Sequence, residues 1–413
     1  MLGWEFPPFF VGGVGMVCYE ICEALGKYSN VEVEYVMAYG PKKKTHMKNV
    51  TISSANLEKL TNVNITQIPS LLYSYDSAEE YSKKYQSLCE LELECSESKN
   101  PMQLYGRNLI QEVYLYAKRV ASLYKNSDFD VIHAHDWTTV PAALLLKKLT
   151  GKPVIVHVHI TELDKTGGNG GYEEVFKIER MAFQKADCLV CVSNFVRNRL
   201  INDYGVDPNK ARVIHNGKIG DISRQIGECN HILKKDKIVL FAGRMTLQKG
   251  PEYFIRAAKK VLEYEPNTKF IVAGGGDMLG QIIEYAAHLG IGKNVFFHGG
   301  SYSREDAIKY FSIADIFVMP SVSEPFGVVP LEAIARGTPT IISKQSGISE
   351  VLTNTFKVDF WDTDEIAHKI LALIRYPHLH NLMREEGSHE LDKFSWDKPA
   401  KKIVDTYLEF TKR

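Results

Sequence analysis

Two glutamates eight positions apart, Glu324 and Glu332, are the residues of this chain best placed to do chemistry. They lie in the segment Ser323-Glu324-Pro325-Phe326-Gly327-Val328-Val329-Pro330-Leu331-Glu332-Ala333. This segment directly follows a strand-like apolar run, Ala314–Pro320. Because a residue before proline avoids α geometry, Pro325 predicts that Glu324 lies in a loop.

The second glutamate is predicted to lie on a short helix, because Pro330 suits a first helical turn and Gly337 suits a helix end. Carboxylates accept hydrogen bonds from hydroxyl groups, and the N–H groups at a helix start attract phosphate. The segment is therefore suited to a polyhydroxylated ligand that carries an anion. The alternative is that Glu332 only complements the helix dipole and that Glu324 is a solvated loop acid.

A second candidate site is the loop Gly243-Arg244-Met245-Thr246-Leu247-Gln248-Lys249-Gly250-Pro251, which follows another predicted strand. Pro251 suits the first position of a helix, so the positive end of the predicted helix Pro251–Tyr264 points back at this loop. Arg244 and Lys249 flank that end. Two fixed cations can neutralise the charge that grows on a departing diphosphate without a metal. The alternative is an ordinary pair of surface cations.

Glycines and histidines mark two further candidates near the N-terminus. In Phe10-Val11-Gly12-Gly13-Val14-Gly15, the absence of side chains lets a backbone approach a phosphate closely. His-x-His steps occur in His133-Ala134-His135-Asp136-Trp137 and in His157-Val158-His159. Residues two apart on a strand share a face, so each step resembles half of a metal site. No third ligand with recognisable spacing accompanies them, so we expect no metal, and we expect His133 and His157 to fill the core or to support the residues that contact a ligand.

A rival signal is the spacing Gly274-x-Gly276-x3-Gly280, which follows a predicted strand and is typical of dinucleotide binding. Such a site needs an acid at the end of the next strand to hold the ribose hydroxyls. The next predicted strand, Asn294–His298, ends in His298-Gly299-Gly300 without an acid. The missing acid disfavours an NAD-dependent oxidoreductase, which is kept as an alternative.

Composition narrows the class of protein. The chain has 413 residues, enough for two sizeable cores, with 45% hydrophobic and 24% charged residues. Fifty basic and fifty acidic residues give zero net charge, which disfavours nucleic-acid binding by bulk electrostatics. The seven cysteines lack metal spacing, and Cys188 and Cys191 lie in an apolar run typical of buried thiols. No stretch is apolar enough to span a membrane and no secretory signal is present, so we expect a cytoplasmic protein.

Strands and helices alternate along the chain, and the near-continuous apolar strands imply parallel sheets covered on both faces. The strands predicted for a first sheet are Val31–Met37, Val131–Ala134, Val154–Val158, Cys188–Val192 and Arg212–Ile214. Those predicted for a second sheet are Lys237–Ala242, Lys269–Ala273, Asn294–His298, Asp315–Met319 and Thr338–Ile342. The first strand either is a stub or begins upstream of Met1.

We predict an α/β chain of two Rossmann-like domains that face a cleft. The first domain spans residues 1–217, a polar linker spans 218–235, and the second domain spans 236–394. A final helix in residues 395–413 is expected to pack back on the first domain. Residues 41–103 are the least regular part, and Tyr105–Tyr124 has helical spacing.

Together these motifs resemble those of retaining GT-B glycosyltransferases, especially glycosyltransferase family 4 and its glycogen-synthase relatives. The resemblance rests on two glutamates separated by seven residues and on the Gly-Arg…Lys-Gly loop, and it covers nearly the whole chain. It implies a GT-B fold and the transfer of a hexose, with retention, from a nucleotide sugar to a hydroxyl of a glycan or glucan. Glycogen synthases carry a lysine where this chain has Phe9-Phe10-Val11, which argues against that activity, whereas His135-Asp136-Trp137 favours glucose.

The resemblance also implies site residues. Those implied to bind the donor are Gly13, Arg244, Lys249, Gly275, Tyr302, Phe326, Gly327, Val328 and Glu332. Those implied to act in transfer are Arg244, Lys249, Glu324 and His159, with His159 beside the donor sugar. The acceptor-side candidates are Asp136, Trp137 and Asn216. No metal or other cofactor is implied, and the family favours front-face displacement, in which the leaving phosphate helps to deprotonate the acceptor.

The expected partners are a nucleotide sugar and a carbohydrate acceptor, without nucleic acid. Peripheral membrane association, the oligomeric state, the nucleotide base, the sugar and the linkage are left open. A GT-B-like protein that binds a nucleotide sugar without turnover is the main alternative, and the NAD-dependent oxidoreductase is the other.

Overall fold

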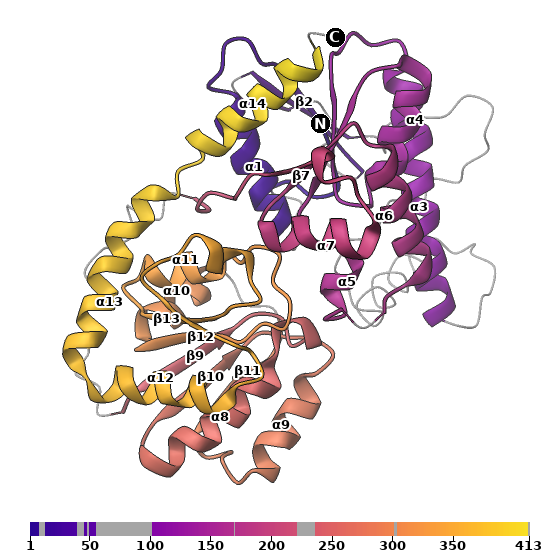
Figure 1. The fold of residues 1–413 in the computed structure, drawn as a ribbon. Coiled ribbons are helices and arrows are strands. Elements are labelled where there is room, and N and C mark those ends of the chain that lie inside the picture. The colour runs from indigo at the N-terminus through magenta and orange to yellow at the C-terminus, as the bar shows by residue number, and fades with distance from the viewer. Residues whose placement is uncertain are drawn as a thin grey trace.

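The structure is a computed structural model that describes residues 1–7, 13–38, 45–47, 49–54, 101–168, 170–220, 236–300 and 304–411. Two lobes, each built on one sheet, make up this part of the chain (Figure 1). Tyr302 and residues 221–235 of the predicted linker lie outside the described residues. The predicted α/β class with two mostly parallel sheets is confirmed.

The first sheet has eight strands in the order β3-β4-β2-β1-β5-β6-β7-β8, and all of its pairings are parallel except that of β3 with β4. Its strands are β1 (Leu2–Gly3), β2 (Val33–Met37), β3 (Thr45–Met47), β4 (Val50–Ser54), β5 (Ile132–His135), β6 (Val154–Val158), β7 (Cys188–Cys191) and β8 (Ala211–Val213). The strand order runs outward from β1 in both directions, so the reversal point lies between β1 and β5.

The second sheet has six parallel strands in the order β11-β10-β9-β12-β13-β14. They are β9 (Ile238–Ala242), β10 (Lys269–Ala273), β11 (Val295–His298), β12 (Ile316–Met319), β13 (Thr340–Ser343) and β14 (Phe356–Val358). Here the order reverses between β9 and β12, two strands that are far apart in the sequence.

Helices cover the faces of both sheets (Figure 1). In the first lobe they are α1 (Gly13–Leu25), α3 (Pro101–Tyr124), α4 (Val140–Thr150), α5 (Glu162–Lys165), α6 (Glu173–Lys185), α7 (Asn194–Tyr204) and the 3-10 turn η2 (Pro208–Lys210). In the second they are η4 (Leu247–Lys249), α8 (Pro251–Tyr264), α9 (Leu279–His288), α10 (Arg304–Ile313), α11 (Val329–Ile334), η5 (Gly347–Glu350), α12 (Thr363–Arg375), α13 (Pro377–Glu390) and η6 (Leu391–Lys393). The last helix is α14 (Asp397–Thr411).

Local patterning predicted most of these elements. Strands β6 and β10 and helix α8 have the predicted bounds. The strand predicted from Thr338 begins instead at Thr340, because Pro339 has no N–H to join the ladder. Strands β3, β4 and β14 were not predicted, since they are short and carry polar residues.

Helix α14 runs back from the second lobe to the first, where it lies beside α1 (Figure 1). The indole Nε1 of Trp396 donates to the carbonyl of Lys218 at 2.8 Å. Further along α14, Glu409 forms an ion pair with Arg212 at 2.7 Å. The helix therefore ties the end of the chain to the first sheet.

Candidate active site

The loops that follow β9 and β12 meet at the reversal point of the second sheet. In an open parallel sheet, ligands bind beyond the carboxyl ends of the strands at such a point, because the neighbouring loops diverge there. The pairing of β12 with β9 brings Lys249 beside Glu324, although the two residues are 75 positions apart. The two sequence motifs best suited to chemistry, the loop that carries Lys249 and the segment that carries Glu324, are thus in direct contact.

The ammonium of Lys249 lies 2.5 Å from Oε2 of Glu324, with side-chain exposures of 18% and 9%. Lys249 ends the turn η4, and Gly250 follows with φ 64° and donates to the carbonyl of Leu247. A Cβ at Gly250 would lie 2.2 Å from the carbonyl oxygen of Pro320. Only glycine fits there, and this close approach fixes the backbone position from which the Lys249 side chain extends.

The backbone of Glu324 is held by the segment that follows β13. Its N–H donates to the carbonyl of Gln345 at 3.0 Å, and its carbonyl accepts from the N–H of Gly347 at 2.9 Å. The hydroxyl of Ser321 also donates to Oε2 of Glu324 at 3.3 Å. Glu324 lies in a loop as predicted, and the neighbouring strand-end loop keeps its carboxylate in place.

The second glutamate lies on a short helix as predicted, because α11 carries Glu332 and Gly337 follows its end with φ 75°. The backbone N–H groups of Phe326, Gly327 and Val328 have no acceptor among the residues that the structure describes. The Phe326 side chain is buried in the core. This loop therefore presents N–H donors next to the Glu324 carboxylate.

Arg244 is exposed on the loop after β9, five residues before Lys249. The N–H of Met245 donates to the carbonyl of Gly275 at 2.8 Å, which joins this loop to the one after β10. Gly275 therefore lies beside the Arg244 loop. Tyr302, the remaining residue expected in this pocket, is outside the described part of the chain.

The glycines that suggested dinucleotide binding have a packing role. A Cβ at Gly274 would lie 2.1 Å from the carbonyl oxygen of Gly243, and one at Gly276 would lie 2.5 Å from that of Met245. Both glycines have positive φ, 133° and 147°. The close approach of two strand-end loops accounts for Gly274 and Gly276 without a dinucleotide, whereas a Cβ at Gly280 would meet no atom within 4 Å.

His159 contacts the core of the first lobe. Its Nε2 lies 2.9 Å from Nδ1 of His135, and its ring is buried. Asp136 has φ 57°, and its Oδ1 accepts from the N–H groups of His159 at 2.7 Å and Ile160 at 3.3 Å. Burial raises the pKa of Asp136 to about 7, although these two hydrogen bonds oppose the shift.

The other first-lobe candidates come from three different segments of the chain. Trp137 is buried, with the ammonium of Lys165 5.9 Å from its ring centroid. Asn216 is also buried, and its Oδ1 has no partner among the described residues. Gly13 opens α1 at an exposed position where a Cβ would meet no atom within 4 Å.

The two lobes touch through the loops at the carboxyl ends of their sheets. Ser193 Oγ donates to the carbonyl of Pro325 at 2.5 Å, and Ser323 Oγ donates to Oδ1 of Asp164 at 2.8 Å. Asp164 in turn forms an ion pair with Arg199 at 3.1 Å. The loop that carries Glu324 therefore faces the first lobe.

Glu350 makes a second bridge between the lobes. It accepts from the N–H groups of Asn194 at 2.9 Å and Phe195 at 2.7 Å, and it lies 2.9 Å from Nε2 of His215. Burial alone would raise the pKa of Glu350, but these hydrogen bonds outweigh it and lower the pKa. Sequence analysis missed this bridge, because its partners come from the other lobe and leave no local pattern.

A buried carboxyl supports the loop that reaches this interface. Both carboxylate oxygens of Glu179 accept from the N–H of Glu162, at 2.9 and 3.1 Å, and the hydroxyl of Tyr204 lies 2.5 Å from Oε2. Burial raises the pKa of Glu179 to about 8, although its hydrogen-bond partners oppose the shift. The folded protein therefore holds this carboxyl protonated at a pH where the unfolded chain ionises it.

This shift predicts a pH dependence of stability. The contribution of Glu179 is present below about pH 4.5 and is lost as the pH rises to about 8. Glu179→Gln, which cannot ionise, is expected to flatten this decline by on the order of 3 kcal/mol. Urea denaturation at pH 5, 7 and 9 measures the free energy of unfolding of each protein. Glu174→Gln, at an exposed position of α6, is the control. An equal slope in Glu179→Gln and the parent protein would contradict the assignment.

No helix in the described part of the chain is long and apolar enough to cross a membrane. Two family models match the sequence: the one described as Glycosyltransferase Family 4 over residues 96–217, and the one described as Glycosyl transferases group 1 over residues 225–390.

Known proteins extend this likeness over nearly the whole chain. The chain is 27% identical over 435 residues to an uncharacterized glycosyltransferase of Methanocaldococcus jannaschii, with 98% of this chain and 97% of the relative covered. It is 28% identical over 314 residues to the UDP-Gal:alpha-D-GlcNAc-diphosphoundecaprenol alpha-1,3-galactosyltransferase of Escherichia coli, with 71% and 79% covered. Its fold matches that of sucrose-phosphate synthase from Thermosynechococcus elongatus with a TM-score of 0.71 at 18% identity, covering 99% of this chain and 97% of that one. The two sheets, the facing strand-end loops and these matches show that the chain belongs to the GT-B glycosyltransferases of the family 4 type.

Proposed function

We propose that the protein transfers a hexose, with retention, from a nucleoside diphosphate sugar to an acceptor hydroxyl. The observation that carries this proposal is the 2.5 Å contact between Lys249 and Glu324 at the reversal point of the second sheet. It places a cation that can neutralise a leaving diphosphate next to a carboxylate that can accept sugar hydroxyls.

The surrounding groups suit the rest of such a donor. Arg244, on the same loop as Lys249, is proposed to share the diphosphate, because guanidinium binds phosphate oxygens in pairs. Glu332 is proposed to accept from the ribose hydroxyls. The unpaired N–H groups of Phe326–Val328 are proposed to donate to the sugar, since donors without a partner gain most from a ligand.

Glu324 is proposed to accept sugar hydroxyls through the oxygen that Lys249 does not contact, and the family resemblance favours a mechanism without a protein nucleophile. We therefore propose front-face displacement. The bond between the sugar C1 and the diphosphate oxygen breaks, the acceptor oxygen bonds to C1 from the same face, and the leaving oxygen takes the acceptor proton. Retention follows from attack on that face. Trapping a glycosylated side chain during turnover would contradict this mechanism.

The name of the Escherichia coli relative specifies a UDP-linked hexose and a lipid-linked glycan. We propose a uridine donor and a carbohydrate acceptor on that basis, with glucose as the first sugar to test because of His135-Asp136-Trp137. Thermal shift with UDP-, ADP- and GDP-glucose tests this proposal, and we expect UDP-glucose to stabilise the protein most. A ligand at a hundred times its dissociation constant adds about 2.7 kcal/mol to stability. If nucleotide sugars with several different hexoses cause no thermal shift, the proposal is contradicted.

Arg244→Ala separates binding from turnover. Loss of a charged hydrogen bond costs about 1.5–3 kcal/mol, so we expect the Kd for the preferred donor to rise about tenfold to a hundredfold. Calorimetry measures the affinity, and product formation with an oligosaccharide acceptor measures turnover. Tight binding without any product in the parent protein would favour the non-catalytic alternative. A change in nicotinamide absorbance would favour the oxidoreductase.

A further inference from the structure

Four imidazoles form a buried row in the first lobe. His133 and His135 lie on β5, His157 lies on β6 opposite His135, and His159 follows β6. Neighbouring rings stack with centroids 4.4 to 5.4 Å apart. The alternation of strand side chains puts all of them on the sheet face that α1 and α14 cover.

Most of the ring nitrogens in this row lack a partner. His133 Nδ1 lies 2.5 Å from the hydroxyl of Tyr407, and His135 Nδ1 lies 2.9 Å from Nε2 of His159. The other nitrogens, His133 Nε2, His135 Nε2, His159 Nδ1 and both of His157, have no hydrogen-bond partner among the residues described. An unpaired buried polar group costs about 1–3 kcal/mol. So many in one place point to a missing ligand.

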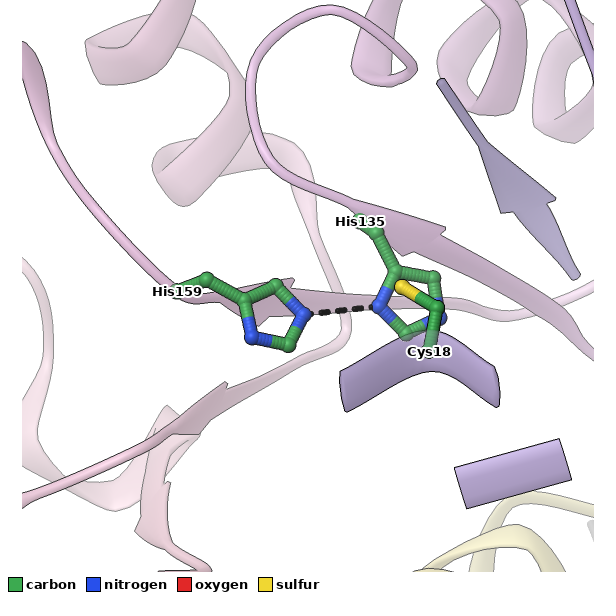
Figure 2. A group of neighbouring side chains, drawn as sticks. All are labelled: Cys18, His135 and His159. Atoms are coloured by element: carbon green, nitrogen blue, oxygen red, sulfur yellow. Dashed lines mark hydrogen bonds between the residues drawn. The ribbon is translucent and has the colours of Figure 1, made fainter. Parts of the chain in front are cut away.

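Helix α1 brings a thiol to the same place. The Sγ of Cys18 and one nitrogen each of His135 and His159 lie within 4.8 Å of one another (Figure 2). All of these side chains are buried, and Cys18 is a free thiol. The third ligand that the His-x-His steps lack in sequence therefore comes from a distant helix.

There is room for an ion beside Cys18 and His135, in a cavity that His159 itself does not line. A small cavity of about 20 Å³ is lined by Cys18 and His135, and Glu5 and Asp136 line it too. That volume admits one water or one metal ion. A thiolate and a carboxylate together balance the charge of a divalent ion, which a buried site requires.

We propose that Cys18, His135 and His159 bind a zinc-class divalent ion, with the fourth position open to water or to the Glu5 carboxylate. Sulfur and imidazole ligands suit zinc and do not suit magnesium or calcium. Ligand atoms around tetrahedral zinc lie about 3.3–3.8 Å apart, so small side-chain shifts are enough in a set whose ligand atoms all lie within 4.8 Å of one another. Binding deprotonates the Cys18 thiol and releases one proton, while each imidazole stays neutral with its proton on the nitrogen that does not bind.

The bound ion would clamp α1 to the ends of β5 and β6. Gly13, expected to approach the donor phosphate, opens the same helix five residues before Cys18. The site thus holds the helix that positions the glycine loop. This inference does not rest on the proposed transfer reaction, because its tests read metal binding and not turnover.

Co²⁺ is the probe, because a thiolate bound to Co²⁺ gives a charge-transfer absorption band. We expect reduced, metal-free protein to bind one Co²⁺ per chain with this band, and Zn²⁺ to displace it and raise the melting temperature. Cys18→Ser should abolish the band. His135→Asn should weaken Co²⁺ binding by about tenfold or more, since even residues that only support a metal ligand contribute this much.

Cys22→Ser is the matched control. Cys22 is a buried thiol one turn further along α1, with its Sγ 3.9 Å from the sulfur of Met1. It should keep the band. The proposal fails if the parent protein shows no band, or if Cys18→Ser retains it. If Cys18→Ser does not fold, X-ray absorption on the zinc-loaded parent protein decides: one sulfur and two imidazoles in the first shell support the site, and a shell without sulfur overturns it.

Discussion

Lys249→Ala is expected to lower kcat/KM about 10²–10³-fold, mostly through kcat. In the proposed reaction charge develops on the leaving diphosphate in the transition state, and removing one fixed group aimed at such charge costs about 2.7–4 kcal/mol. The change also leaves the Glu324 carboxylate without its ion-pair partner, so a lower melting temperature is expected as well. Initial rates with the preferred nucleotide sugar, with melting curves alongside, measure both effects.

Lys237→Ala is the matched control for this change. Lys237 pairs with Asp315 at 3.3 Å, which puts a more exposed lysine–carboxylate ion pair at the amino end of β9, away from the strand-end loops. We expect kcat/KM to stay within about twofold, because an exposed ion pair contributes little. If Lys249→Ala keeps more than a tenth of the activity of the parent protein, the leaving-group role of this lysine is wrong.

Gly250→Ala is expected to have the largest effect on stability. Its φ of 64° is costly for alanine, and the new Cβ would lie 2.2 Å from the backbone oxygen of Pro320. A strained left-handed residue costs about 1–3 kcal/mol. The clash adds to this, because a backbone oxygen at the end of β12 cannot move without disturbing Glu324. Urea denaturation, with donor affinity measured by calorimetry, should show losses in both stability and binding.

Gly151→Ala separates strain from clash. Gly151 ends α4 with φ 71°, and a Cβ there would meet no atom within 4 Å. We expect this variant to lose only the strain term of about 1 kcal/mol and to bind the donor normally. Equal destabilisation by Gly151→Ala and Gly250→Ala would show that the contact with Pro320 has no energetic importance.

Local patterns were sufficient for the elements that position the second-lobe site. The apolar run of β10 and the helical spacing after Pro251 predicted those elements with their observed bounds, because burial on one face leaves a period in the sequence. Pro325 and Pro330 likewise predicted which glutamate lies in a loop and which on a helix, since proline restricts its own and the preceding φ and ψ. Strand β14, with its sequence Phe-Lys-Val, was too short to carry such a period.

Side-chain direction in the first lobe was harder to predict. The ring of His159 lies against His135, and its expected place beside the donor sugar stays a prediction. The two-residue period of a β-strand predicts that His157 and His159 share a face. It does not predict which face meets the core and which meets the other lobe. That choice depends on α1, whose Cys18 occupies the same face.

The sequence by itself determined the alternation of strands and helices, the turn residues, and the chemical types available at each strand end. Only the tertiary structure decided which strand ends are neighbours. Lys249 reaches Glu324 because β12 pairs with β9, and Cys18 reaches His135 because α1 covers β5 and β6. Strand order is set by competition among contacts between distant segments, and periodic burial within one segment carries no record of which of those contacts prevails.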